Sequence, residues 1–207
     1  MFISFEGRDG SGKSTHAKAL AESLEKRGYK VKLVHFPQYD KPIGSVIKEM
    51  LDGKREMPSF KAFQLLYVAD QADFQLELQR YLDNDYIVIA DRYDLSTIAY
   101  YASKFSIGAG VAFSDFATLQ HGLEKPVLTF IFNSNFKDLD TRRAGMDKKC
   151  DAIENDKAIM DNINDSYLEL YDVLKGYGFR DVQLIDSDYN IEHNKVIILS
   201  KVLSSIK

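Results

Sequence analysis

The chain has 207 residues, of which 45% are hydrophobic and 28% are charged, and its formal net charge is −4. This length and composition suit a single domain with a sizeable core, which we expect to span residues 1–207. A mildly acidic chain lacks the basic surface that nucleic acids and anionic membranes attract. The lone Cys150 excludes an internal disulfide, and no apolar run reaches the roughly 18–20 residues of a membrane span. We therefore expect a soluble, cytoplasmic protein with no nucleic-acid or membrane partner.

Residues 2–21 (FISFEGRDGSGKSTHAKALA) combine an apolar strand, a glycine-rich turn and the start of an amphipathic helix. The pattern G-x-x-x-x-G-K-[ST] is met by Gly7, Gly12, Lys13 and Ser14. The backbone N–H groups of such a loop surround phosphate oxygens, and the next helix adds the positive end of its dipole. Lys13 can then reach the β- and γ-phosphates, and the Ser14 hydroxyl can bind Mg²⁺. An accidental match in a glycine-containing turn is the alternative.

The rest of the chain alternates apolar runs with helical patterns. Strands are expected at residues 31–36, 86–90, 127–132 and 182–185. Helices are expected up to residue 27 and at residues 43–51, 59–82, 94–104, 155–176 and 192–206, with another ending near residue 122. This alternation predicts an α/β protein with the three-layer P-loop NTPase fold, in which a parallel sheet of about five strands has helices on both faces and a short lid.

Parallel strands deliver the residues at their carboxyl ends to the edge where the phosphate loop lies. Phe36, Pro37 and Tyr39 follow the second strand and are expected near the site, although ordinary loop packing explains them equally well. Asp91 ends the next strand, where a carboxylate can help to order Mg²⁺. Arg92 follows it with a planar guanidinium that suits a phosphate. A structural salt bridge is the alternative for this pair.

The helix expected at residues 59–82 is apolar on more than one face, through Phe60, Phe63, Leu66, Tyr67, Phe74 and Leu78. This surplus indicates either a homodimer contact or a monomer whose core uses these residues. Tyr67 and Gln71 lie one helical turn apart, so a ring and an amide point the same way and could recognise a base together. A core tyrosine beside a solvated glutamine is the alternative.

A polar stretch at about residues 138–156 mixes acidic residues with Arg142, Arg143, Lys148 and Lys149. Such a stretch is usually a solvated helix face. In a phosphoryl-transfer enzyme it can instead be a lid that brings positive charge over the transferring group and excludes water.

The motifs together resemble the thymidylate kinases, P-loop nucleoside monophosphate kinases that make dTDP from dTMP and ATP. The resemblance spans essentially the whole chain, and its most specific piece is IADRYDLSTIAYY at residues 89–101. Asp9, the pair Phe36-Pro37 and the segment LLYVADQ at residues 65–71 occupy the other family positions in order and spacing. The resemblance implies a cytoplasmic, homodimeric enzyme that uses ATP and Mg²⁺ to phosphorylate dTMP.

The resemblance also implies roles for the residues that bind phosphate and metal. Asp9 would meet the sugar 3′-hydroxyl and the Mg²⁺ environment, Arg92 would bind the acceptor phosphate, and Arg142 would lie near the adenine or the base of the lid. The expected ATP-binding residues are Gly7, Arg8, Asp9, Gly10, Ser11, Gly12, Lys13, Ser14, Thr15 and Arg142. The expected Mg²⁺ site comprises Ser14, Asp9 and Asp91.

For the nucleoside, the resemblance implies that Tyr67 stacks on thymine while Phe36 and Pro37 form the pocket wall. Thr97 would approach the base, and Tyr100 would crowd the sugar C2′ and so disfavour ribose. The full set expected to bind substrate is Asp9, Phe36, Pro37, Tyr39, Tyr67, Gln71, Arg92, Thr97 and Tyr100.

The chain departs from the usual family pattern at three places. Gln71 stands where most members have an arginine directed at the thymine O4, so base recognition is weaker or differently tuned. Gln38 and Tyr39 occupy a loop where an arginine often supports the acceptor phosphate, which leaves Arg92, with Lys41, for that task. Gly10 replaces the loop arginine of one subclass, so the catalytic cation comes from Lys13, Arg142, Arg143, Lys148 or Lys149.

Two other functions remain open at this point. A kinase for another deoxynucleotide or for a deoxynucleoside would share the fold, and the deoxynucleoside reaction needs a carboxylate after the second strand, where Asp40 is close. A nucleotide-dependent switch or binding module is more remote. Residues 135–138 (NFKD) have the wrong order for a guanine-reading motif, and Asp91-Arg92 stands in place of the Asp-Glu of an ATPase.

Overall fold

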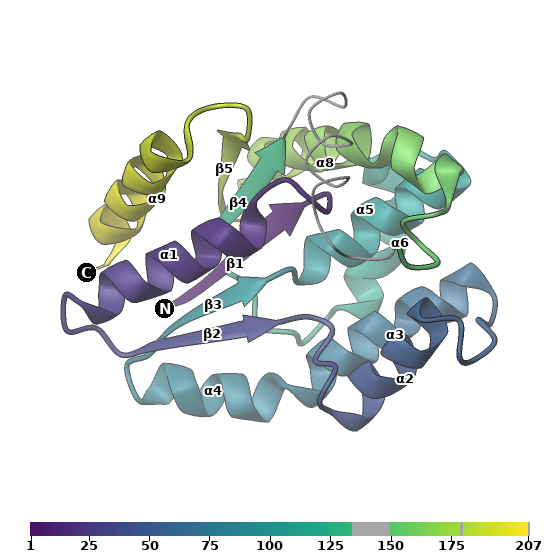
Figure 1. Ribbon diagram of the computed structural model, residues 1–207, viewed down its shortest axis with the longest axis horizontal. Helices are drawn as coiled ribbons and strands as arrows, with labels where there is room; N and C mark the ends of the chain where they lie inside the picture. The colour runs from purple at the N-terminus through teal and green to yellow at the C-terminus, as the bar shows by residue number, and fades with distance from the viewer. Residues whose placement is uncertain (134–149, 179, 207) are drawn as a thin grey trace.

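The computed structural model describes residues 1–133, 150–178 and 180–206. Within these residues, five parallel strands form a sheet in the order β2-β3-β1-β4-β5 (Figure 1). The strands are β1 (Phe2–Gly7), β2 (Val31–His35), β3 (Ile87–Asp91), β4 (Leu128–Asn133) and β5 (Asp181–Asp186). The predicted α/β class and parallel sheet are confirmed. Because β1 is the central strand, the loop that follows it opens at the middle of the carboxyl edge.

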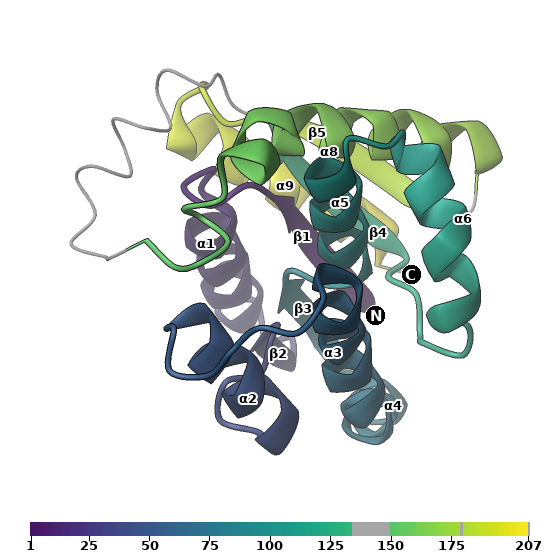
Figure 2. The same ribbon diagram turned by 90° about the vertical axis from the view of Figure 1, so that its right-hand side faces the viewer.

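Helices cover both faces of the sheet (Figure 2). One face carries α1 (Lys13–Glu25) and α9 (Ile191–Ser205). The other face and its flank carry α2 (Pro42–Leu51), α3 (Phe60–Asp73), α4 (Gln75–Asp83), α5 (Asp94–Phe105), α6 (Ala109–Leu119) and α8 (Lys157–Tyr177). Among the described helices, none combines the length and apolarity needed to cross a membrane.

The alternation of side chains along β1 explains the layers. Ile3 and Phe5 face α1 and α9, and they belong to a buried cluster with Phe130 of β4. Phe2 faces the opposite side and packs edge-on against Tyr93, with ring centroids 5.0 Å apart. Burying each such side chain stabilises the fold by roughly 1.5–3 kcal/mol. The inner strands β1, β3 and β4 are buried on both faces because helices cover both faces of the sheet.

The helix expected at residues 59–82 is two helices. The two helices are separated only at Phe74, which belongs to neither, although its φ of −79° and ψ of −12° stay in the right-handed helical region. Its buried ring packs edge-on against Phe36, with centroids 5.5 Å apart. Phe63 is buried in the cluster around α5 and α8, whereas Phe74 and Leu78 are buried against β3. Most of the extra apolar residues of the 59–82 region are thus buried within the protomer, in two separate clusters of its core. Most other expected boundaries agree within two or three residues.

Candidate active site

The phosphate loop runs from Gly7, where β1 ends, to Lys13, where α1 begins. Gly7 and Gly12 have φ angles of 137° and 90°, which only glycine adopts easily. A Cβ on Gly7 would lie 2.6 Å from the carbonyl oxygen of Phe132 on β4. The loop therefore requires glycine at this position for space as well as for conformation.

The Lys13 side chain folds back into this loop. Its Nζ donates a hydrogen bond to the Arg8 carbonyl oxygen at 2.7 Å, and the residue is 4% exposed. Burial, and after it the charge of Arg92, lowers the pKa of Lys13 to about 8, although Asp9 and Asp91 act in the opposite direction. An anion bound in the loop would stabilise the charged ammonium, which is what a nucleotide phosphate supplies.

Asp91 connects the carboxyl end of β3 to the first turn of α1. The Ser14 hydroxyl donates a close hydrogen bond to Asp91 Oδ2, and His35 Nδ1 lies 3.5 Å from the same oxygen. Burial alone would raise the pKa of Asp91, but the His35 hydrogen bond and the charge of Lys13 outweigh it and bring the pKa to about 2. Within the described residues, the buried Oδ1 atom has no hydrogen-bond partner. An ionised carboxylate with an unused oxygen therefore faces the phosphate loop.

Arg92 lies between the phosphate loop and the rest of the site. Its φ angle is +67°, a strained value for a residue with a side chain. Its backbone N–H donates to the Phe5 carbonyl, and Glu6 Oε1 accepts from the backbone N–H of Tyr93 at 2.9 Å. These bonds to β1 hold the turn. The guanidinium contacts Gly7 O at 2.9 Å, Ser96 Oγ at 3.2 Å, Tyr100 Oη at 3.3 Å, Tyr167 Oη at 3.4 Å and Asp9 Oδ1 at 2.8 Å.

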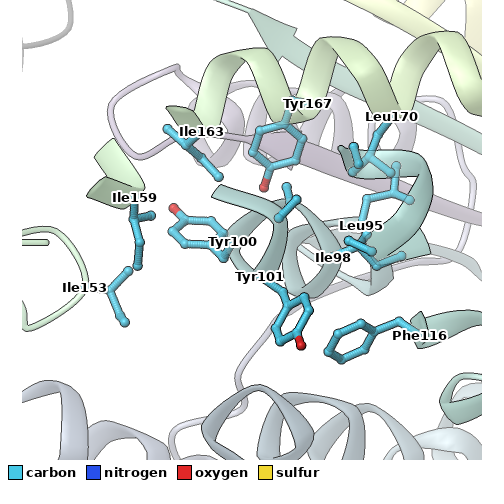
Figure 3. Packing of buried hydrophobic residues seen from close by; sticks show 14 of the residues in the cluster. Leu95, Ile98, Tyr100, Tyr101, Phe116, Ile153, Ile159, Ile163, Tyr167 and Leu170 are labelled. Atoms are coloured by element: carbon cyan, nitrogen blue, oxygen red, sulfur yellow. The ribbon is translucent and has the colours of Figure 1, made fainter. Parts of the chain in front are cut away.

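A buried polar network supports this arginine from below. Ser96 Oγ donates to Glu6 Oε2 at 2.6 Å and lies 2.9 Å from Tyr167 Oη. Burial, followed by repulsion from Asp94, raises the pKa of Glu6 to about 7. Tyr100 from α5 and Tyr167 from α8 project from the apolar cluster drawn in Figure 3, whose side chains fix both rings. Packing far from the phosphate loop thus sets the position of the Arg92 fork.

A pocket adjoins this arginine and is lined by residues of β2, α3, α5 and the connecting loops. Every residue that the sequence predicted to bind substrate lines it, namely Asp9, Phe36, Pro37, Tyr39, Tyr67, Gln71, Arg92, Thr97 and Tyr100. Leu51, Gln64, Ser96, Asp151 and Ile153 are among the other lining residues. The structure therefore brings the predicted set together, while the role of each residue in binding stays a prediction.

The predicted pair on α3 has the expected geometry. Tyr67 and Gln71 both line the pocket, and Gln71 is 1% exposed, so it is not a solvated residue. Gln71 Nε2 donates to Thr97 Oγ1 on α5 at 3.4 Å. The Tyr67 ring meets Phe63 edge-on, with centroids 5.3 Å apart, which fixes one of its sides against the core.

One expectation is not met in this arrangement. Lys41 does not line the pocket, and its Nζ pairs with Glu77 of α4 at 3.3 Å. Phe36 lines the pocket as expected, and its ring, which is 2% exposed, also packs against Phe74 and Tyr93. The cations predicted for the lid, Arg142, Arg143, Lys148 and Lys149, lie outside the described residues.

Several residues that shape the site were not predicted. Glu6 could have been found, since it is a charged residue inside an apolar strand. Ser96 lies within the segment at residues 89–101 that carries the family resemblance, but the sequence pattern indicated no role for it. Tyr167 and Asp151 carry no local signal, because they reach the site through the packing of α8 and the segment before it.

A glycine-rich phosphate loop after the central strand, beside a pocket that carries an arginine, defines a P-loop nucleotide kinase. The family profile described as thymidylate kinase matches residues 5–193 of the chain. A thymidylate kinase from Exiguobacterium sp. is 33% identical over 203 residues, covering 93% of this chain and 89% of the relative. One from Mycoplasma capricolum subsp. capricolum is 30% identical over 217 residues, covering 100% of this chain and 98% of the relative.

The fold agrees with these relatives. The solved structure of thymidylate kinase from Candida albicans aligns with a TM-score of 0.83 at 25% identity, covering 99% of this chain and 91% of that chain. The chain belongs to the thymidylate kinase family. It is accordingly a dTMP kinase, a phosphotransferase that uses ATP.

Proposed function

We propose that the pocket holds dTMP with its phosphate against Arg92, that the phosphate loop holds ATP, and that the γ-phosphoryl group passes between them. One observation carries this proposal. Arg92 donates to the carbonyl of Gly7, the first residue of the phosphate loop, and also lines the pocket, so a phosphate on the pocket side lies next to the loop. Holding the two reactants side by side supplies most of what phosphoryl transfer needs.

The acceptor oxygen of dTMP is already anionic, so the reaction needs no strong general base. The chain's own contribution is positive charge at fixed positions, which stabilises the transition state as charge spreads over the transferring group. Lys13 serves the phosphate loop, and Arg92 serves the acceptor phosphate. Asp9, which pairs with Arg92 at 2.8 Å, holds the guanidinium before substrate arrives and can meet the sugar 3′-hydroxyl afterwards.

The residues at the end of β3 suit Mg²⁺. The Ser14 hydroxyl and the free Oδ1 of Asp91 are oxygen ligands, which Mg²⁺ prefers, directly or through water. The described residues contain no cluster of three or more metal-binding side chains. A cation that takes most of its ligands from phosphates and water requires none. Bound there, Mg²⁺ would neutralise charge on the β- and γ-phosphates.

The nucleoside end follows from the same geometry. Tyr67 is placed to stack on the base, Gln71 and Thr97 to meet its polar edge, and Tyr100 to lie against the sugar. A deoxynucleoside kinase would need a carboxylate after β2 to take the proton of a neutral hydroxyl. Asp40, the candidate for that role, is exposed and outside the pocket lining, which favours a monophosphate acceptor.

An acceptor panel tests the proposal directly. ADP release is measured with ATP and Mg²⁺ while dTMP, dUMP, dGMP, dCMP and thymidine are offered separately. We expect turnover with dTMP and none with thymidine. ADP release that needs no acceptor would instead indicate an ATPase or a switch, and a preference for thymidine would overturn the assignment of the phosphate to Arg92.

We also infer a homodimer formed through the 59–82 region. Leu65 of α3 is 36% exposed and Leu76 of α4 is 77% exposed, so some apolar surface of this region is uncovered in the protomer. Sedimentation should give a dimer for the wild-type chain and a monomer for Leu76→Lys. Val196→Lys, at an exposed apolar position on α9, is the matched control and should leave the dimer intact. A monomeric wild-type chain would contradict the inference.

A further inference from the structure

We propose that Gln71 lets the base pocket accept 4-amino pyrimidines as well as thymine, so that the enzyme also phosphorylates dCMP and its 5-methyl derivative. The step is the one proposed for dTMP. An acceptor phosphate oxygen forms a bond to the γ-phosphorus of ATP, the bond from that phosphorus to the bridging oxygen breaks, and ADP leaves. The inference rests on the proposed function, because it assumes that the base of the acceptor reaches Gln71.

The Gln71 side chain carries an unused hydrogen-bond acceptor. Gln71 is 1% exposed and lines the pocket, yet within the described residues its Oε1 atom accepts no hydrogen bond. Its Nε2 atom donates to Thr97 Oγ1 at 3.4 Å and keeps a second hydrogen. Buried polar atoms normally have partners. Gln71 therefore keeps an acceptor and a second donor hydrogen without partners, and a base that enters the pocket it lines can supply both partners.

Thymine supplies the complementary pair of groups. Its O4 accepts a hydrogen bond and its N3–H donates one. With Gln71 oriented as in the structure, the second hydrogen of Nε2 can meet O4 while Oε1 accepts from N3–H. The amide then makes two parallel hydrogen bonds to one edge of the base, the arrangement that best distinguishes bases.

The arrangement of Gln71 and Thr97 can invert at little cost. Rotating the Gln71 amide by half a turn exchanges Oε1 and Nε2. The Thr97 hydroxyl can both donate and accept, so it can turn its hydrogen toward Oε1 and keep a bond in the inverted state. Cytosine presents an N4–H donor and an N3 acceptor, which match the inverted amide. The pair Gln71–Thr97 can thus adjust to either edge, whereas an arginine could only donate and would favour the 4-oxo base.

The helix that carries Gln71 is held while the amide turns. The Gln71 carbonyl accepts a hydrogen bond from Gln75 Nε2 at 2.7 Å, and Gln75 also donates to Tyr93 Oη at 3.0 Å. The backbone of α3 is thereby fixed against the turn that follows Arg92. Only the terminal amide and the hydroxyl of Thr97 need to move between the two states.

The test compares two acceptors that differ only at the pairing edge, dTMP and 5-methyl-dCMP, by ADP release with ATP and Mg²⁺. For the wild-type enzyme we expect kcat/KM values within about tenfold of each other, since each base forms two hydrogen bonds to the amide. In Gln71→Arg, kcat/KM for 5-methyl-dCMP should fall about 100-fold relative to dTMP. Gln71→Met, similar in size but without polar atoms, should lower both values and leave their ratio near that of the wild type. Thr97→Val should also lower both.

The outcomes separate this inference from the function on which it rests. Turnover of dTMP with discrimination of more than about 1000-fold against 5-methyl-dCMP would overturn the inference and leave the function intact. No turnover of either acceptor would overturn the function itself. A Gln71→Arg variant with the same Tm as the wild type could also leave the ratio of the two kcat/KM values unchanged. That result would show that Gln71 does not recognise the pairing edge of the base. If Gln71→Arg does not fold, the Gln71→Met ratio decides, because discrimination appearing there contradicts the inference.

Discussion

Both terminal nitrogens of Arg92 already have hydrogen-bond acceptors within the protein. Tyr100 and Asp9 contact its Nη2 atom on the pocket side, while Gly7 and Tyr167 contact Nη1. The Asp9 carboxylate, 36% exposed on its side chain, is the contact that an incoming phosphate can most easily replace. Burial would lower the pKa of Arg92, but Asp9, the Tyr100 and Tyr167 hydroxyls and Asp91 raise it well above its usual value, so the guanidinium stays charged.

The shape of this fork should matter as much as its charge. Arg92→Lys keeps the charge but cannot span both sides of the site. We expect KM for dTMP to rise roughly 10- to 100-fold, the effect of losing charge-assisted hydrogen bonds, with a lower kcat and a smaller change in KM for ATP. Steady-state kinetics with each substrate varied measures this split. Unchanged dTMP kinetics would remove Arg92 from the acceptor site.

Glu6 gives a pH dependence of folding stability. Its pKa is raised from 4.5 to about 7 by burial and by Asp94, against the Ser96 hydrogen bond. Between these values the folded state binds more protons than the unfolded state, so this residue's favourable contribution is full below about pH 4.5 and is lost as the pH rises through about 7. Urea unfolding of the wild type and Glu6→Gln at pH 5 and 8 should show that the wild type loses stability relative to the variant at the higher pH. Equal changes in both proteins would contradict this.

At the residue scale, the site residues that could be predicted were those that belong to a spaced motif or follow a buried strand. Gly7, Lys13 and Ser14 follow from one pattern, and Asp91 with Arg92 follows from the rule that parallel strands end at one edge. Tyr167 could not be predicted, because its hydroxyl reaches Arg92 across a sequence separation of 75 residues. Only the packing of α8 on α5 makes that contact.

The helices set how closely loops approach the pocket. Gly44 lies in α2, where an added Cβ would be 2.0 Å from the carbonyl oxygen of Gln38, a backbone atom. Pro37 and Tyr39 on either side of Gln38 line the pocket. We expect Gly44→Ala to lower the free energy of unfolding by about 2 kcal/mol, an ordinary cost of overpacking, and to raise KM for dTMP.

Gly176 of α8 is the matched control. Nothing lies within 4 Å of a Cβ added there. Gly176→Ala should therefore stabilise the protein by about 0.5 kcal/mol through helix propensity and leave dTMP kinetics unchanged. Urea unfolding and steady-state kinetics of both variants make the comparison. Similar effects of the two substitutions would show that the contact between α2 and Gln38 does not constrain the loop.

At the element scale, the sequence predicted strands better than helix boundaries. The three inner strands, β1, β3 and β4, are short apolar runs whose burial on both faces leaves a strong local signal. The break at Phe74 leaves none, because the residues on both sides of it keep good helix-forming patterns. At this break the Phe74 ring packs against Phe36 and the cluster on β3, contacts that depend on the whole fold.

The layers of the molecule are joined by a buried ion pair. Asp94 at the start of α5 accepts a bidentate pair of bonds from Arg180, with Nη2 to Oδ2 at 2.7 Å and Nη1 to Oδ1 at 3.1 Å. The two side chains are 1% and 5% exposed. Lys125, which precedes β4, lies 3.3 Å from the same carboxylate. Segments far apart in the sequence therefore meet at a single carboxylate, on the face of the sheet that carries α5.

This ion pair should make folding depend on both partners together. Asp94→Asn leaves the buried Arg180 without its charged partner, and Arg180→Met leaves the buried Asp94 with Lys125 alone, so each should lower the free energy of unfolding by about 3–5 kcal/mol. The double variant leaves neither the buried carboxylate nor the buried guanidinium, and it should lose clearly less than the sum of the two. Burial would raise the pKa of Asp94, but Arg180 and Lys125 bring it from 3.8 down to about 2. Its contribution is therefore present above about pH 3.8 and is lost as the pH falls through about 2. Urea unfolding of the four proteins at pH 7 measures the coupling. Additive losses would mean that the layers are held by apolar packing, without help from this pair.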